Sequence, residues 1–305
     1  MNLQTTLEEA GVARGADALA ATPPVPLNVH VSSSSTAPAT PELASSALPT
    51  WLEPRNLAWR FGAIFLFLLS WEVAPRVGLV NTMFVPPFSK AAVALVSGLF
   101  WGDLGRHLLV SLSRSLVGFV LALCTALPLG LLLGWFQKFE SYADPLLQVF
   151  RQTSAFALFP LFILVFGIGE TSKVAIIFYG AQWYILLNTS SGVKHVDPLL
   201  IKLARSLKLS HFQLFRKIIL PAALPTIFTG LRLSATLSIL LIVSAEMMGA
   251  STGLGLVLVT AQYNFDVDRM YAAIMLLALT GYFANYLLVA LERRLTGWKP
   301  EIMSY

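Results

Sequence analysis

The chain has 305 residues, of which 56% are hydrophobic and only 12% are charged, and its mean hydropathy is +0.71. A soluble domain carries about a quarter charged residues, so this composition excludes an ordinary soluble domain and predicts a polytopic membrane protein. The net charge of +5 does not indicate a nucleic-acid-binding protein, because Lys and Arg lie between apolar stretches and not on one soluble face.

The first 50 residues differ in composition from the rest of the chain. Residues 20–50 read AATPPVPLNVHVSSSSTAPATPELASSALPT and show no hydrophobic periodicity. Such a segment cannot bury enough apolar surface to offset chain entropy, so we expect residues 1–50 to form a disordered cytoplasmic extension. We expect no signal peptide, because no basic segment precedes an apolar run near Met1. Residues 51–300 are predicted to form the transmembrane domain, and residues 301–305 a short cytoplasmic tail.

Six apolar stretches are long enough to cross a bilayer, which requires about 20 helical residues. They are Leu57–Val77, His107–Trp135, Pro145–Phe166, Ser172–Ser191, Pro221–Gly249 and Met270–Leu291. The sequence therefore predicts an all-α fold with about six transmembrane helices. Gly130 and Gly134 are four residues apart in the second stretch, a spacing that lets two helices pack closely.

The distribution of Lys and Arg between these stretches predicts the orientation. If the N-terminus lies in the cytoplasm, thirteen Lys and Arg residues flank the spans on the cytoplasmic side and five on the other side. This count places Lys138 and Arg151 on the cytoplasmic side. Because positive charge accumulates in cytoplasmic loops, both termini are predicted to be cytoplasmic.

Residues 199–226 read LLIKLARSLKLSHFQLFRKIILPAALPT, with five basic residues and no acid. Asp197 followed by Pro198 favours a helix start, and Ser210 with Gln213 has the spacing of a capping box. We predict two short helices in residues 197–216. An apolar stripe follows the first of them at helical spacing: Leu200, Leu203, Ala204 and Leu207. A stripe of this kind fits either an interfacial helix on anionic lipid or a docking element for a soluble partner.

This segment resembles the cytoplasmic loop of the permease subunits of ABC importers. That family carries EAA, three residues, Gly, nine residues, and Ile-x-Leu-Pro, and Ile218–Pro221 matches its end. The match aligns Lys202 with the family glutamate and Lys208 with the family glycine. The glycine usually relieves a left-handed turn, where Lys costs about 1 kcal/mol or adopts another turn. The resemblance implies a coupling helix pair that docks on an ATPase, through Lys202, Leu203, Ala204, Arg205, Leu207, Lys208, Ser210 and Phe212.

Further stretches resemble one branch of that family, which imports taurine, alkanesulfonates, nitrate or bicarbonate. They are PLFILVFGIGE at 160–170, SLSR at 111–114, TGLR at 229–232 and AEM at 245–247. The residues at 246–255 look more like sulfonate permeases and the turn at 208–210 more like nitrate permeases, and we favour the first. The resemblance implies a type I ABC importer permease that transports an alkanesulfonate or taurine, with nitrate or bicarbonate as the alternative.

The same resemblance implies partners and a location. Cytoplasmic ATPase subunits would bind the ATP, and a periplasmic or lipid-anchored binding protein would deliver the substrate. A second, identical permease copy would complete the pathway in the bacterial inner membrane. No cofactor or metal is expected on this chain, because Gly167–Lys173 lacks the glycine that a phosphate loop needs before its lysine. A secondary transporter would instead show inverted repeats, and the sequence shows none.

Polar residues inside the spans are the candidates for the transport pathway. Ionisable groups in a membrane are costly and tend to face a bundle interior or a water-filled cavity. They could stabilise an anion in transit, or they could join helices through ion pairs and hydrogen bonds. The candidates are Arg114, Gln182, Asn188, Arg232 and Glu246.

Overall fold

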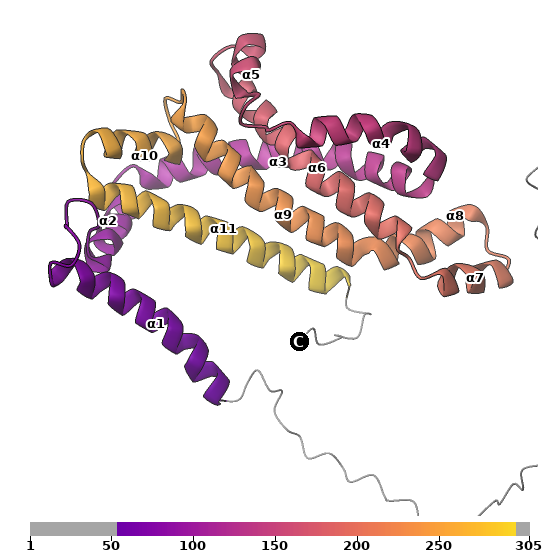
Figure 1. The fold of residues 1–305 in the computed structure, drawn as a ribbon, viewed down its shortest axis with the longest axis horizontal. Helices are drawn as coiled ribbons and strands as arrows, with labels where there is room; N and C mark the ends of the chain where they lie inside the picture. The colour runs from indigo at the N-terminus through magenta and orange to yellow at the C-terminus, as the bar shows by residue number, and fades with distance from the viewer. Residues whose placement is uncertain (1–53, 297–305) are drawn as a thin grey trace, which may run out of the picture. The chain divides into compact units, whose positions relative to one another are not determined.

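The computed structural model describes residues 54–296, so the predicted extension at 1–50 and tail at 301–305 lie outside the described residues. The described residues form helices joined by short turns, with no strand among them (Figure 1). In chain order the helices are α1 (Pro54–Arg76), α2 (Phe88–Phe100), α3 (Leu104–Trp135), α4 (Gln137–Gln152), α5 (Phe159–Phe166), α6 (Glu170–Lys194), α7 (Pro198–Ser206), α8 (His211–Leu214), the π-helical turn η2 (Phe215–Ile219), α9 (Leu220–Met247), α10 (Leu254–Tyr263) and α11 (Val267–Leu295).

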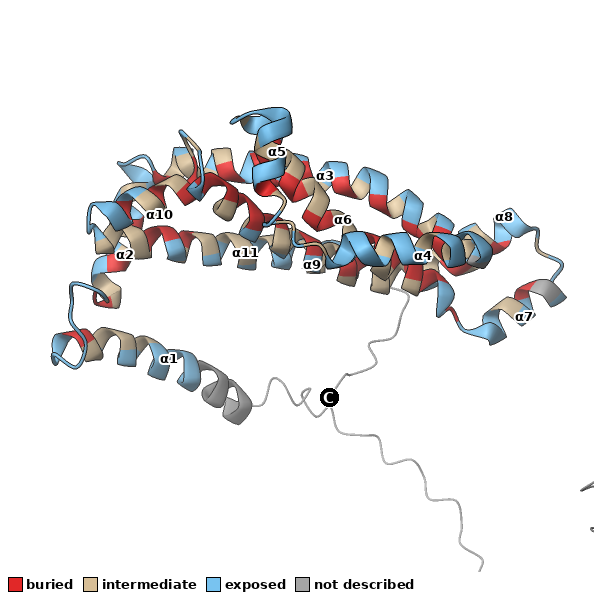
Figure 2. Ribbon diagram, turned by 45° about the horizontal axis from the view of Figure 1, so that its top comes forward, coloured by how far each residue is buried: buried red, intermediate tan, exposed pale blue. Residues whose placement is uncertain are grey.

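Helices α3, α6 and α9 form the centre of the bundle. Helix α6 packs along α3 on one side and along α9 on the other, and Figure 2 shows buried residues gathered on these helices. The glycine pair of α3 allows the close approach to α6. A Cβ atom on Gly130 would lie 2.7 Å from Thr189 Cβ, and one on Gly134 would lie 2.6 Å from Val193 Cβ. The predicted packing role of this glycine pair is therefore confirmed.

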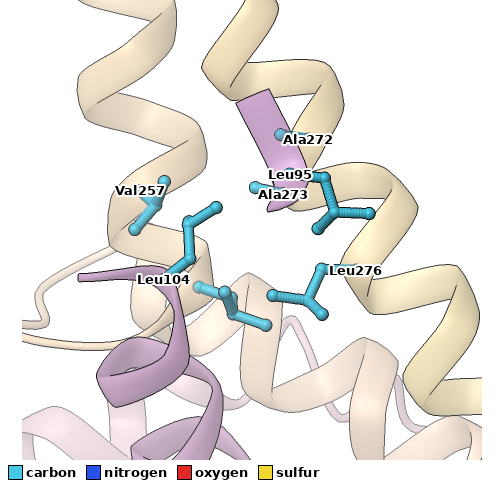
Figure 3. Close-up of a cluster of buried hydrophobic side chains, with 7 residues drawn as sticks. Leu95, Leu104, Val257, Ala272, Ala273 and Leu276 are labelled. Atoms are coloured by element: carbon cyan, nitrogen blue, oxygen red, sulfur yellow. The ribbon is translucent and has the colours of Figure 1, made fainter. Parts of the chain in front are cut away.

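A second cluster of buried side chains joins α2, α10 and α11 to the start of α3 (Figure 3). Leu104 and Leu254 are almost fully buried there, beside Ala272 and Ala273 of α11. Arg269 adds an ionic contact, because its Nη2 donates to both Asp103 carboxylate oxygens at 2.7 and 2.8 Å. Partial burial raises the pKa of Asp103, but the hydrogen bonds and charge of Arg269 outweigh it and hold the pKa below its ordinary value.

Three helical segments of the described chain are long and apolar enough to cross a membrane: Leu104–Trp135, His211–Met247 and Val267–Leu295. They correspond to the second, fifth and sixth predicted spans. The fourth predicted span coincides with α6, whose 25 residues extend over about 37 Å. The first coincides with α1, which has 23 residues. The total of six spans stays a prediction.

The third predicted span, Pro145–Phe166, is wrong as a continuous helix. Helix α4 ends at Gln152, residues 153–158 leave the helical path, and α5 begins at Phe159. Pro160 has no N–H to donate to Phe156, which favours a helix start at this point, and Pro160 lies in the first turn of α5. At the end of α4 the Phe150 carbonyl accepts a hydrogen bond from the Tyr179 hydroxyl of α6 at 2.6 Å, which satisfies one of the carbonyls that a helix end leaves free.

The start of the fifth span also differs from the prediction. Instead of a new start at Pro221, one helical segment of 37 residues runs from His211 to Met247. The turn η2 widens the helix just before Pro221, which accommodates a proline that lacks its N–H donor. Helices α2 and α10, with 13 and 10 residues, were missed because the prediction considered only membrane-length stretches.

Candidate functional site

The two short helices predicted in residues 197–216 are present, and local side chains define their ends. Asp197 Oδ1 accepts a hydrogen bond from Leu199 N at 2.8 Å, at the start of α7. Ser210 Oγ accepts from Gln213 N at 3.3 Å, while Gln213 Oε1 accepts from Ser210 N at 3.1 Å. This reciprocal pair is the predicted capping box of α8. Helix α8 then continues through η2 into α9.

Lys208 adopts the left-handed conformation that the aligned family position favours, with φ of 52°. Leu209 N donates to Ala204 O at 3.2 Å, the bond that closes a helix end of the Schellman type. Glycine normally occupies such a position because it has no Cβ atom to clash there. Lys208 therefore keeps the turn at some cost in backbone free energy.

Lys208→Gly is expected to stabilise the permease by up to about 1 kcal/mol, because it removes the left-handed strain. The measurement is the denaturant midpoint of the purified permease, compared with Lys208→Val, which should lower it. An unchanged or lowered midpoint for the glycine variant would contradict this explanation of the turn.

The apolar stripe that runs along α7 to Leu207, the residue directly after it, divides between two surroundings. Ala204 is 1% exposed and packs with Leu214 and Ile219, so it attaches the helix pair to the bundle. Leu203 and Leu207 are 56% and 65% exposed. Four other predicted docking residues, Lys202, Lys208, Ser210 and Phe212, are exposed as well, with the phenylalanine 70% exposed. Arg205 lies in α7, but its side chain is not among those described.

Exposed leucines and a phenylalanine on adjoining short helices form an apolar surface at one end of the bundle. Surfaces of this kind mark an interface with a protein or a membrane. We name Leu199, Leu203, Leu207 and Phe212 the docking surface.

Arg114 and Glu246 are brought together inside the bundle. Both side chains are buried, and Arg114 Nη1 donates to Glu246 Oε1 at 2.7 Å. Arg114 also donates from Nε and Nη2 to the Glu170 carboxylate, and from Nη1 to Thr252 O at 2.6 Å. Burying a charge is costly unless it is paired and hydrogen-bonded. This guanidinium is paired on both sides, so it joins α3 to the start of α6 and the end of α9.

The Glu246 carboxylate accepts further hydrogen bonds in the same place. Ser111 Oγ lies 2.9 and 2.8 Å from its two oxygens, and Gly255 N donates to Oε2 at 3.0 Å. The turn before α10 closes tightly over the carboxylate. Gly253 has φ of 129°, and a Cβ atom on it would lie 2.2 Å from Glu246 Cδ. A side chain at position 253 would therefore displace the carboxylate.

The other pathway candidates lie elsewhere. Arg232 of α9 forms an ion pair with Glu292 of α11 at 3.1 Å, and its Nη2 donates to Thr229 Oγ1 at 3.3 Å. Asn188 Nδ2 donates to Tyr184 O at 2.8 Å within α6, and Gln182 is partly buried on the same helix. The five candidates do not converge on one cavity. The ion-pair alternative describes the surroundings of Arg114, Arg232 and Glu246.

Sequence reasoning missed the other partners of Arg114 and Glu246. Glu170, Ser111 and Thr252 were not among the candidates, although the first two belong to stretches that carried the family resemblance. Glu170 directly follows Gly169 at the start of α6, and an acid at a helix start is a usable signal for a polar contact. Nothing in the local sequence links it to Arg114, 56 residues away.

The described residues thus form a bundle of apolar helices with membrane-length members, an exposed helix pair at one end and a buried ionic cluster around Arg114 and Glu246, which is the architecture of a polytopic membrane protein. The family described as binding-protein-dependent transport system inner membrane component matches residues 126–297. The chain belongs to this family, and it is therefore a multi-pass permease subunit of an ABC importer in the inner membrane. The subunit itself is not an enzyme and carries no cofactor.

Two curated relatives cover most of the chain. SsuC of Bacillus subtilis (strain 168), described as an aliphatic sulfonates transport permease protein, is 34% identical over 80% of this chain and 90% of its own length. The taurine transport system permease protein TauC of Escherichia coli (strain K12) is 30% identical over 82% of this chain and 97% of its own length. Among solved structures, the inward-facing MetNI methionine ABC transporter matches with a TM-score of 0.58 and 21% identity, over 65% of this chain and 98% of that one.

Proposed function

We propose that two copies of this chain form the pathway through which a small anion, an alkanesulfonate or taurine, enters the cell. ATPase subunits bind the docking surface, and a binding protein delivers the substrate on the opposite side. The observation that carries this proposal is the apolar docking surface on α7 and α8. Leu203 and Leu207 expose more than half of their surface there, on helices that the family resemblance places against the ATPase.

The continuous helix from the docking surface into the bundle supports a mechanical role for it. The segment His211–Met247 has 37 residues, which correspond to about 55 Å. Its first turn carries Phe212 of the docking surface. Its last turn carries Glu246, which pairs with Arg114 in the buried ionic cluster. Movement of the ATPase subunits would therefore be transmitted along one continuous helical segment to the opposite end of the bundle.

The descriptions of the two curated relatives support the substrate class, together with the family resemblance at residues 246–255. Nitrate or bicarbonate is the alternative. A strain that lacks this gene should fail to grow on an alkanesulfonate or taurine as the only sulfur source, and should grow normally on sulfate. Normal growth on every sulfonate, with loss of growth on nitrate as the only nitrogen source, would replace the substrate class and keep the permease role.

The proposed orientation places the docking surface and both termini in the cytoplasm. We assign only Lys138 of α4 to the cytoplasmic flank, because Arg151 lies at the opposite end of that helix. Twelve basic residues then remain on the cytoplasmic side against five on the other, which preserves the bias.

A reporter that is active only in the cytoplasm is expected to give a signal when it is fused after Tyr305 and none when it is fused at Gly102. The control is an export-dependent reporter at the same two sites, which should show the reverse. The opposite result for both reporters would invert the proposed topology and would remove the docking surface from the ATPase side.

A further inference from the structure

The break between α4 and α5 opens a pocket of about 510 Å³. The last turn of α4 contributes Arg151, the break contributes Thr153 and Ser154, and α6 contributes Trp183. Leu237 and Leu241 of α9 form part of its apolar wall. The pocket thus combines one cation and several hydroxyl groups with an aromatic and aliphatic surface.

The proposed topology, in which Lys138 marks the cytoplasmic surface of the membrane, places this pocket at membrane depth. Arg151 follows Lys138 by thirteen residues of α4, a distance of about 20 Å along the helix, against a hydrocarbon thickness of about 30 Å. Non-helical backbone at such depth is tolerated where it is buried in protein or lines a water-filled cavity. An ionisable residue at such depth marks a substrate or ion pathway.

Arg151 differs from three other arginines of the bundle in having no carboxylate partner among the described residues. Arg114, Arg232 and Arg269 all form ion pairs with carboxylates. Arg151 is exposed, and no carboxylate within residues 54–296 pairs with it. Its charge therefore remains available to an anion.

Trp183 supplies a second group without a partner. Its Nε1 atom is buried, and among the described residues no acceptor is bonded to it. The ring is held in place by Phe150, which stacks on it at a centroid distance of 6.5 Å, and by Tyr179 at 5.8 Å. A buried N–H without an acceptor is costly, and an oxygen atom of a bound ligand would satisfy it after a small movement of the ring.

We propose that this pocket binds the substrate during its passage and selects an alkanesulfonate. The sulfonate oxygens accept hydrogen bonds from Arg151 and the Ser154 hydroxyl, and the indole of Trp183 provides a further donor. The alkyl chain lies against Leu237 and Leu241. This assignment rests on the proposed transport function, and it adds the residues that recognise the substrate.

The lining favours an alkanesulfonate over nitrate or bicarbonate. A planar oxyanion would satisfy the cation but would leave the aliphatic wall in contact with water. An alkyl chain removes that apolar surface from water, and each buried methylene improves affinity about fourfold. The pocket therefore predicts that affinity rises with chain length among short sulfonates.

The test is binding of methanesulfonate, 1-butanesulfonate and nitrate to the purified permease–ATPase complex, measured by titration calorimetry. We expect 1-butanesulfonate to bind most tightly and nitrate least. Arg151→Gln should weaken 1-butanesulfonate binding by about tenfold to a hundredfold, and Trp183→Phe by a few-fold. Arg151→Lys should retain part of the affinity. The matched control is Lys138→Gln, at the other end of α4, which should bind like the unmodified protein.

Three outcomes would refute substrate binding in this pocket. They are no binding of 1-butanesulfonate to the intact complex, tightest binding of nitrate, or equal affinities of Arg151→Gln and Lys138→Gln for 1-butanesulfonate. Co-purification of the ATPase subunits with each variant separates this result from the proposed function. If the unmodified permease fails to bind the ATPase subunits, the transport function is wrong. If the complex forms but Arg151 has no effect, only the pocket is wrong.

Discussion

Replacing both Leu203 and Leu207 with Asp is expected to reduce co-purification of the ATPase subunits by orders of magnitude. These side chains are 56% and 65% exposed, so each has apolar surface that a partner can bury. A fully buried Leu contributes roughly 1.5–3 kcal/mol, so removing both leucines from the interface corresponds to a decrease in affinity of more than about a hundredfold. The measurement is the ratio of ATPase to permease after affinity purification.

The control introduces two Asp residues at exposed apolar positions away from the docking surface. Leu79 and Met83 lie in the turn between α1 and α2 and are 78% and 54% exposed. Their double Asp variant should insert in the membrane and retain the ATPase subunits. Undiminished co-purification of the Leu203→Asp/Leu207→Asp variant would refute the docking surface. An α7 that only lies on lipid would detach from the membrane surface and leave the complex intact.

Removing the charge of Arg114 is expected to destabilise the permease by about 3–5 kcal/mol. Arg114→Met leaves the Glu246 carboxylate buried without its cation, while Glu170 keeps Lys173 at 3.4 Å. Adding Glu246→Gln should recover most of the loss, because an amide oxygen still accepts from Ser111 Oγ and Gly255 N. The measurement is the free energy of unfolding from denaturant titration of the purified permease in mixed micelles.

The exposed ion pair of Arg269 and Asp103 is the matched control for the Arg114 and Glu246 variants. Their side chains are 41% and 52% exposed, so solvent screens the interaction, and Arg269→Met should cost less than about 1 kcal/mol. A cost for Arg114→Met no greater than that of Arg269→Met would show that the buried pair does not hold the bundle together. Failure of Glu246→Gln to restore stability would show that poorer packing, and not the unpaired carboxylate, causes the effect.

Signals that act within one segment were sufficient to predict much of the fold. The apolar stretches at α3, α6, α9 and α11 were found from length alone, because a membrane-length helix satisfies its backbone internally. The helix pair at residues 197–216 was found from Asp197, Ser210 and Gln213, whose side chains bond to backbone groups two or three residues away. The family pattern identified position 208 as a left-handed turn but left open whether a lysine would keep it, and the structure shows that Lys208 does.

Only the tertiary structure revealed the break at residues 153–158 and the partners of the buried charges. The stretch Pro145–Phe166 is mostly apolar and long enough to span a membrane, but it is interrupted by the polar run from Arg151 to Ser154. At the end of α4 the Phe150 carbonyl accepts a hydrogen bond from Tyr179 of the neighbouring helix, a contact that the local sequence does not reveal. The sequence shows Arg114 and Glu246 as two isolated ionisable residues, 132 positions apart. The cost of burying a charge requires each of them to have a partner, but no local pattern identifies it, because the choice depends on which helices pack side by side.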